Sequence, residues 1–171
     1  MLEALTTKQL NDILCQASAT KHRYIGAYPA CITPKSKKRI YAFISNTDNH
    51  EEDGEHWCAW VIKDENLFFF DSFGRSPNDE TLPKNFLEIA CNFKHIQYTK
   101  TRIQGWNSNA CGYFCIHFIY MFCLGLDYEE FLNEYTHNYL NNDVVAYNFV
   151  SSIIYLFCFT CTRETIIKGI K

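Results

Sequence analysis

The chain contains the stretch Gln104-Gly105-Trp106-Asn107-Ser108-Asn109-Ala110-Cys111-Gly112, which leads directly into the apolar run Tyr113 to Leu126. An apolar run of this length predicts a buried helix with Cys111 in its first turn. The unpaired backbone N–H groups and the positive dipole end at a helix start favour a thiolate over a thiol. Gln104 lies in the same loop, and we expect its amide to donate a hydrogen bond where an acyl oxygen gains negative charge. The stretch therefore predicts acyl transfer at an exposed, reactive cysteine.

A nucleophilic cysteine needs a base and a group that orients the base. Two strand-like runs supply both, and they flank the turn-like residues Lys63-Asp64-Glu65: they are His56-Trp57-Cys58-Ala59-Trp60-Val61-Ile62 and Asn66-Leu67-Phe68-Phe69-Phe70-Asp71. Folding the chain about the turn places His56 opposite, or nearly opposite, Asp71, where a carboxylate reaches an imidazole nitrogen. Asp71 also ends an apolar run, where a carboxylate needs a partner. We predict His56 as the general base and Asp71 as its orienter.

At these residues the chain resembles the adenovirus-type endopeptidases (adenains), viral cysteine proteases related to the ubiquitin-like-protein proteases. The resemblance rests on His56-Trp57, Asp71-Ser72-Phe73-Gly74 and the Cys111 motif, and more faintly on Tyr24-Ile25-Gly26-Ala27-Tyr28 and Ser45-Asn46-Thr47. It implies an α+β domain of papain-like type with a rearranged topology, in which helices pack on a central mixed sheet. It also implies a cysteine endopeptidase that cleaves capsid and core precursors during virion maturation. Cys111 would be the nucleophile, and Gln104 with the Cys111 backbone N–H would form the oxyanion hole.

The resemblance implies two activators, a disulfide-linked peptide and DNA. This chain has Phe93 where the cysteine for the peptide is expected, and its nearest cysteine is Cys91. It carries 16 Lys and Arg against 19 Asp and Glu, and a net charge of −3 does not favour strong binding to phosphates. We therefore expect no required cofactor and weak or no nucleic-acid binding, with the basic cluster Lys35-Ser36-Lys37-Lys38-Arg39 as a solvated loop.

Length and composition indicate one monomeric domain over residues 1–171, because 47% of the residues are hydrophobic and supply a sizeable core. The 9 cysteines lie among apolar positions, and no secretory signal precedes Glu3. We expect an intracellular protein of the host cytosol or nucleus, packaged in the virion if the resemblance extends so far. Most cysteines are expected to be reduced core residues, including Cys15, Cys58, Cys115, Cys123 and Cys158.

Two segments are apolar enough to suggest a membrane, Ala110 to Leu126 and Val144 to Cys161. The first contains His117, and the second is interrupted by polar residues at Asn148, Ser151 and Ser152. Neither supplies about 20 consecutive apolar residues. We predict two buried core helices and no membrane contact.

The remaining pattern is that of an α+β chain. Capping boxes at Thr6-x-x-Gln9 and Asp127-x-x-Glu130 predict helices to about Ala17 and about Leu140. A third helix is predicted over Leu82 to Asn92, and strands over Ile40 to Ser45, Trp57 to Ile62, Leu67 to Phe70 and His95 to Thr99. The acidic segment Asn46 to Glu55 predicts a solvated surface loop, with a border of the substrate cleft as the alternative.

Two other functions stay open alongside the endopeptidase: an isopeptidase that removes ubiquitin-like modifiers, and a non-catalytic interaction module on a protease fold. We predict no metal site. Cys158-Phe159-Thr160-Cys161 has redox or zinc spacing but lies inside an apolar segment, and Cys111-x-x-x-Cys115-x-His117 has no second ligand pair nearby. Trp57 and Trp106 flank the candidate site as either core or cleft wall.

Overall fold

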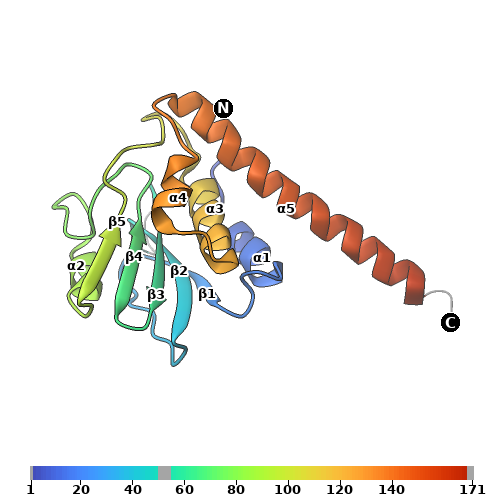
Figure 1. The fold of residues 1–171 in the computed structure, drawn as a ribbon, viewed down its shortest axis with the longest axis horizontal. Coiled ribbons are helices and arrows are strands. Elements are labelled where there is room, and N and C mark those ends of the chain that lie inside the picture. The colour runs from blue at the N-terminus through green and yellow to red at the C-terminus, as the bar shows by residue number, and fades with distance from the viewer. Residues whose placement is uncertain (1, 50–54, 169–171) are drawn as a thin grey trace.

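A five-stranded mixed sheet with helices on both faces forms the centre of the computed structural model (Figure 1). The structure describes residues 2–49 and 55–168, with side chains up to residue 156. The strand order is β1-β2-β3-β4-β5; the outer pairs β1/β2 and β4/β5 are parallel and the inner pairs are antiparallel. The strands are β1 Tyr24–Tyr28, β2 Ile40–Asn46, β3 Trp57–Lys63, β4 Asn66–Phe70 and β5 His95–Tyr98. The predicted α+β class with a mixed central sheet is therefore confirmed.

The two faces of the sheet build two hydrophobic cores. On β3, Cys58, Trp60 and Ile62 lie in one core, while Ala59 and Val61 lie in the other. The period of two in a strand sends successive side chains to opposite faces, and here both faces are covered. This double covering explains why β3 is a continuous apolar run with no alternating polar residues.

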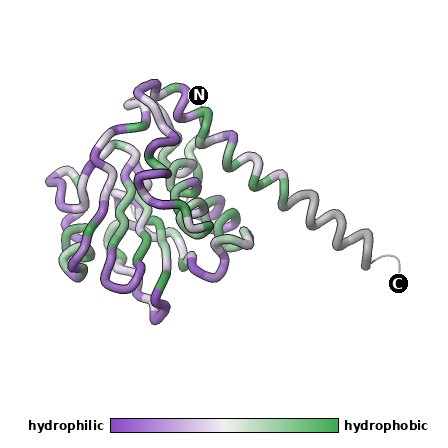
Figure 2. The backbone as a smooth tube through the Cα atoms, in the orientation of Figure 1, coloured by the Kyte–Doolittle hydropathy of each residue, from purple (hydrophilic) through white to green (hydrophobic). Residues whose placement is uncertain are grey.

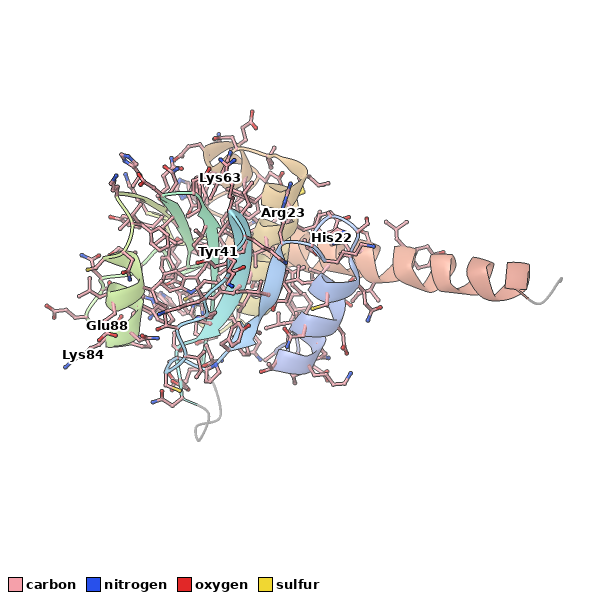
Figure 3. All side chains as sticks on the ribbon, turned by 90° about the horizontal axis from the view of Figure 1, so that it is seen from below. His22, Arg23, Tyr41, Lys63, Lys84 and Glu88 are labelled. Carbon is pink, nitrogen blue, oxygen red and sulfur yellow. The ribbon has the colours of Figure 1, made fainter. Side chains whose placement is uncertain are left out.

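The helices divide unequally between these faces. Helix α2 (Lys84–Ala90) alone covers the core that contains Trp60, while α1 (Thr7–Gln16), α3 (Cys111–Leu124) and the first half of α5 (Tyr139–Lys168) pack on the other. In Figure 3, α2, which carries the labelled Lys84 and Glu88, lies on one side of the sheet, and α1 and α3 lie together on the other side. The short helix α4 (Tyr128–Asn133) joins the α3 layer.

Helix α3 is buried as predicted, but α5 is not. Every residue from Cys111 to Ile119 is buried. On α5 one narrow stripe is buried, at Asn142, Asp143, Ala146, Val150 and Ile153, and large apolar side chains are exposed at Leu140, Val144, Tyr147, Ile154, Tyr155 and Leu156. The prediction of a buried helix over 144–161 is therefore wrong for residues 144–156, whose side chains are described, because α5 touches the body along one side only and then extends away from it (Figure 1). Cys158 and Cys161 lie outside the residues whose side chains are described.

The helix predicted from Asp127 to about Leu140 is also shorter than expected. Its capping box is present, but α4 ends at Asn133 and α5 begins at Tyr139. Between them, the Asn142 side chain accepts a hydrogen bond from the Thr136 N–H, and the Asn138 side chain accepts one from the Asn141 N–H. Such side-chain bonds to the backbone compete with helix continuation. They divide one predicted helix into two.

Three smaller expectations have mixed outcomes. The capping box at Thr6 is present, and the predicted strands and the α2 helix agree with the structure to within about two residues. Strand β1 was not predicted. Cys58 and Cys115 are buried and Cys123 is half-buried, but Cys15 is exposed at the outer side of α1, so its assignment to the core is wrong. Among the described helices, none is long and apolar enough to cross a membrane.

Candidate active site

Cys111 is the first residue of α3, as the sequence predicts, and it faces a cleft of about 810 Å³. It is 5% exposed, so the expectation of an exposed thiol is wrong: Cys111 is a buried residue that lines the cleft. The residue before it, Ala110, makes no side-chain cap, which leaves the first N–H groups of α3 without the usual N-cap acceptor. An uncapped helix start beside a thiol favours negative charge at that place.

His56 lies between Asp71 and Cys111. Its Nε2 is 2.7 Å from Asp71 Oδ1, and both side chains are buried. The pairing of Ala59 with Phe70, continued by one residue, places Cys58 opposite Asp71, so His56 reaches the carboxylate diagonally from the position two residues earlier. The predicted contact is therefore present through a diagonal neighbour. Nε2 is taken by Asp71, which leaves Nδ1 for the hydrogen bond with Cys111.

The surroundings of His56 favour its protonated form. Burial lowers the pKa of the imidazole, but the hydrogen bonds to Asp71 and Cys111 outweigh burial and raise the pKa of His56 to about 9. Burial raises the pKa of Asp71, whereas His56 and Arg75 lower it, with a net downward shift. The pair is therefore a buried imidazolium beside a carboxylate at neutral pH.

A tight turn after β4 holds this pair in place. Asp71 Oδ1 accepts a hydrogen bond from the Phe73 N–H, and Asp71 Oδ2 accepts one from Arg75 Nε at 2.6 Å. Gly74 has φ +77°, and a Cβ there would lie 2.7 Å from the carbonyl carbon of Thr101. Glycine is thus required both by the backbone conformation and by the close approach of the next segment. The turn brings residues 101–104 next to Asp71.

Gln104 is buried at the edge of the cleft. Its Nε2 donates to the Ser108 carbonyl at 2.6 Å, and its Oε1 accepts from Ser72 Oγ at 2.6 Å. Because a backbone carbonyl only accepts hydrogen bonds, the amide nitrogen must be the atom that faces Ser108. One N–H of the amide is left for the cleft, where Cys111 also lies.

Aromatic side chains extend from His56 along the cleft wall. The ring of Phe73 stacks on His56 at 4.6 Å and on Trp106 at 5.2 Å between centroids. The Arg102 guanidinium is 4.3 Å from the Trp106 ring and 4.2 Å from the Tyr139 ring. Trp106 is 70% exposed, so it is cleft wall and not core. Trp57 is buried and also lines the cleft.

The segment before α1 forms another wall. Residues Ala4 to Thr7 line the cleft, the Leu5 carbonyl accepts a hydrogen bond from Trp57 Nε1 at 2.9 Å, and the Leu2 carbonyl accepts one from Asn109. A Cβ on Gly112 would lie 3.0 Å from Leu5 Cβ, so the segment packs closely on the start of α3. On the other side, the described residues Asn46 to Asn49 and Glu55 line the cleft, which is the alternative considered for that loop.

The first turn of α5 supports the loop before Cys111, and sequence reasoning did not identify it. Asn142 is 1% exposed and its Nδ2 donates to the carbonyls of Ile103 and Thr136. Asp143 is buried and hydrogen-bonds Ser108. The one available signal was the run of three adjacent polar residues Asn141-Asn142-Asp143 at the start of a largely apolar helix.

The residues of the Cys111-x-x-x-Cys115-x-His117 spacing, which the sequence did not favour as a metal site, have other partners in the structure. His117 Nδ1 is 2.6 Å from Tyr135 Oη, its Nε2 is 3.3 Å from Glu134, and its ring stacks on Phe149. Cys115 Sγ donates to the Trp57 carbonyl. Ligand atoms of His56, Cys58 and Asp71 lie within 4.8 Å of one another, but the Asp71 oxygens already serve His56 and Arg75. These contacts describe packed side chains rather than a ligand set.

Known proteins similar to this chain are viral proteases. The protease of bovine adenovirus 2 is 33% identical over 98 residues, which are 50% of this chain and 47% of that protein. The protease of bovine adenovirus B serotype 3 is 34% identical over 101 residues, or 51% and 49% of the two chains, and that of bovine adenovirus 7 is 25% identical over 143 residues, or 71% and 66%. The chain thus spans about half the length of the first two relatives.

Two solved structures are similar to parts of this chain at lower identity. An ASFV protease has a TM-score of 0.42 at 19% identity, covering 64% of this chain and 42% of that one. The SUMO protease Ulp1 has a TM-score of 0.30 at 15% identity, covering 65% and 53%. The sequence profile of the adenovirus endoprotease matches residues 24–154, a range that contains His56, Asp71, Gln104 and Cys111. Because that match covers well over half of the chain, the chain belongs to the adenovirus endoprotease family.

Proposed function

We propose that the protein is a cysteine endopeptidase in which Cys111 is the nucleophile, His56 the acid and base, Asp71 the orienter and Gln104 an oxyanion donor. One observation carries the proposal: His56 is hydrogen-bonded to Asp71 at 2.7 Å and interacts with Cys111, which lies at an uncapped helix start in the same cleft. Family membership supports the same reading. A nucleophile, a base and an orienting group within hydrogen-bond reach are what acyl transfer requires.

The reaction follows from these positions. The Cys111 thiolate attacks the carbonyl carbon of the scissile peptide, and the carbonyl oxygen becomes an oxyanion near the Gln104 amide and the Cys111 N–H. The imidazolium of His56 gives its proton to the amine nitrogen, so the C–N bond breaks and the amine product leaves while a thioester remains on Cys111. Water then attacks the thioester and gives a proton to His56. The acid product leaves, and the thiolate–imidazolium pair is restored.

The substrates are proposed to be capsid and core precursor proteins cut during virion maturation, with small residues such as glycine at the scissile bond. Membership of the adenovirus endoprotease family supports this choice. The cleft supports an extended polypeptide, because it runs between the Ala4–Thr7 segment, the Asn46–Asn49 segment and the Gln104–Asn109 loop.

We propose that this activity needs neither a disulfide-linked peptide nor DNA. Position 93 is a phenylalanine, and within the basic cluster Arg39 pairs with Asp64 while Lys38 Nζ donates to the His22 carbonyl. A turnover assay under reducing conditions and at low salt, with and without DNA and a precursor-derived peptide, tests this. Activity that appears only with an additive refutes it, and Cys91, which is exposed, becomes the first thiol to examine.

The deciding experiment is co-expression of candidate virion precursors with the wild-type chain and with Cys111→Ala. We expect defined fragments with the wild type and intact precursors with the variant. Ubiquitin-like-modifier conjugates form the second substrate panel. Release of modifiers without cleavage of precursors would assign an isopeptidase, and wild-type and Cys111→Ala samples that look alike on both panels would leave a non-catalytic module.

A further inference from the structure

Ser72 connects the two halves of the candidate site. It follows Asp71, and its backbone carbonyl accepts hydrogen bonds from the N–H groups of Ile103 at 2.9 Å and Gln104 at 3.2 Å. Its hydroxyl donates to Gln104 Oε1 at 2.6 Å, and both side chains are almost completely buried. One residue therefore makes three hydrogen bonds to the segment that carries the amide of Gln104.

In the described residues the Gln104 side-chain amide has two hydrogen-bond partners, and they differ in kind. The carbonyl of Ser108 belongs to the same loop as Gln104, so it moves with the loop. Ser72 belongs to the turn that is fastened to β4 and to the His56–Asp71 pair. Only the Ser72 bond ties the amide to the part of the site that holds the base.

An amide that rotates by half a turn exchanges its donor for its acceptor. If Oε1 faced the cleft, a carbonyl lone pair would meet the developing oxyanion and oppose the reaction. The Ser108 carbonyl excludes that orientation, because it accepts only from Nε2, and the Ser72 hydroxyl then holds Oε1 in place from the side of Asp71. We propose that Ser72 is a positioning residue that anchors the Gln104 amide to the turn carrying Asp71 and so sets the distance of the amide from the His56–Cys111 pair. This inference rests on the proposed function.

The kinetic test is a double-mutant cycle on a quenched fluorescent peptide that spans a cleaved precursor bond. Ser72→Ala should lower kcat about ten-fold, roughly the rate equivalent of one hydrogen bond, with KM within about two-fold. Gln104→Ala should lower kcat roughly 10²-fold. In the Gln104→Ala background, Ser72→Ala should have almost no further effect. Ser76→Ala is the matched control, because its hydroxyl bonds to Asn78 outside the site.

Two results would overturn the role of Ser72. One is a Ser72→Ala enzyme with wild-type kcat. The other is a ten-fold loss that persists when Gln104 is already alanine, since that loss would come from packing elsewhere. If Ser72→Ala does not fold, Ser72→Thr keeps the hydroxyl and should retain kcat within about three-fold; a folded Ser72→Thr with a larger loss counts against the proposal.

A spectroscopic readout separates this inference from the proposed function. The side-chain amide resonance of Gln104, assigned by its absence in Gln104→Ala, should be sharp in the wild type and broadened or doubled in Ser72→Ala. An unchanged resonance refutes the positioning role even in an active enzyme. A wild type without Cys111-dependent cleavage refutes the proposed function, while the resonance still decides what Ser72 does to the amide.

Discussion

Helices α3 and α5 look alike in sequence but differ in their surroundings. Both are long, largely apolar segments with few charges, and in Figure 2 green residues recur along the coloured part of α5. Helix α3 is enclosed by the sheet, α1 and α5, whereas α5 rests on α3 along one stripe. Hydrophobicity alone indicates that a helix needs covering, but the neighbours decide whether it is covered on all sides. Because α3 is buried from Cys111 to Ile119, it holds Cys111 in a fixed position.

Among substitutions in α3 and α5, those at the N-terminus of α3 should reduce peptide cleavage the most. Cys111→Ala is expected to reduce peptide cleavage to background, since no other described thiol lies between His56 and the cleft. Cys115→Ala, one turn further along α3 in the core, is the matched control and should retain cleavage. Measurement of kcat/KM for both variants checks this, and cleavage by a folded Cys111→Ala enzyme would end the assignment.

The ionisation of His56 should appear in the pH dependence. Because the pKa of His56 is raised from 6.5 to about 9, we expect kcat/KM to fall as the pH rises through about 9, when the proton for the leaving amine is lost. Asp71→Asn removes a group that raises this pKa, so the alkaline limb should move to lower pH and kcat should fall by roughly 10²-fold or more.

The raised pKa of His56 should also make the stability of the fold depend on pH. The folded-state pKa exceeds the ordinary value, so the stabilisation is complete below about pH 6.5 and is lost as the pH rises to about 9. Thermal unfolding between pH 6 and 9 should show a decline in Tm for the wild type that is smaller for Asp71→Asn. Equal slopes for the two proteins would contradict the coupling of His56 to Asp71.

Core substitutions should separate the two helices by stability. Phe118 on α3 is 1% exposed and contacts Phe70, Tyr128 and Phe131, so Phe118→Ala should destabilise the fold by about 3–5 kcal/mol. Leu156 on α5 is 60% exposed, and Leu156→Ala should change stability by no more than about 0.5 kcal/mol. Denaturant unfolding measures both. Equal costs would mean that the exposed side of α5 is covered in solution.

The first turn of α5 should behave like α3 rather than like the rest of α5. Asn142→Ala leaves the Ile103 and Thr136 carbonyls without a buried donor and should cost about 1–3 kcal/mol. Asn141→Ala is the matched control, since its side chain is exposed and the neighbouring cap uses only its backbone N–H. Equal unfolding midpoints for the two variants would place the support of the loop elsewhere.

Sequence reasoning succeeded where function depends on short, ordered patterns. The Cys111 motif, the hairpin that joins His56 to Asp71 and both capping boxes act over a few residues, so their geometry follows from local rules. It failed where the outcome depends on distant partners. Strand β1 pairs in parallel with β2 and has a register irregularity between Tyr24 and Ala27, where Gly26 has φ +138°, so it shows no clear strand pattern.

The contributions of α5 and of Ser72 could not be predicted for a related reason. Nothing in the spacing of residues 72, 104 and 142 shows that they meet, because their contacts arise from the packing of three separate segments. The exposure of α5 likewise depends on how much neighbouring surface is available. Local patterns identified the candidate groups of the site, whereas the groups that hold them are visible only in the folded chain.

The wall formed by Ala4 to Thr7 has a practical consequence for anyone who makes this protein. The backbone of Leu2 and Leu5 is fastened to Asn109 and Trp57, so whatever is fused ahead of Leu2 starts at the rim of the cleft. An affinity tag at that end would lie beside the cleft and compete with substrate for it. An activity assay of such a fusion would then report a lower activity than that of the untagged enzyme. A tag after α5, whose far end lies away from the sheet in Figure 1, leaves the entrance free.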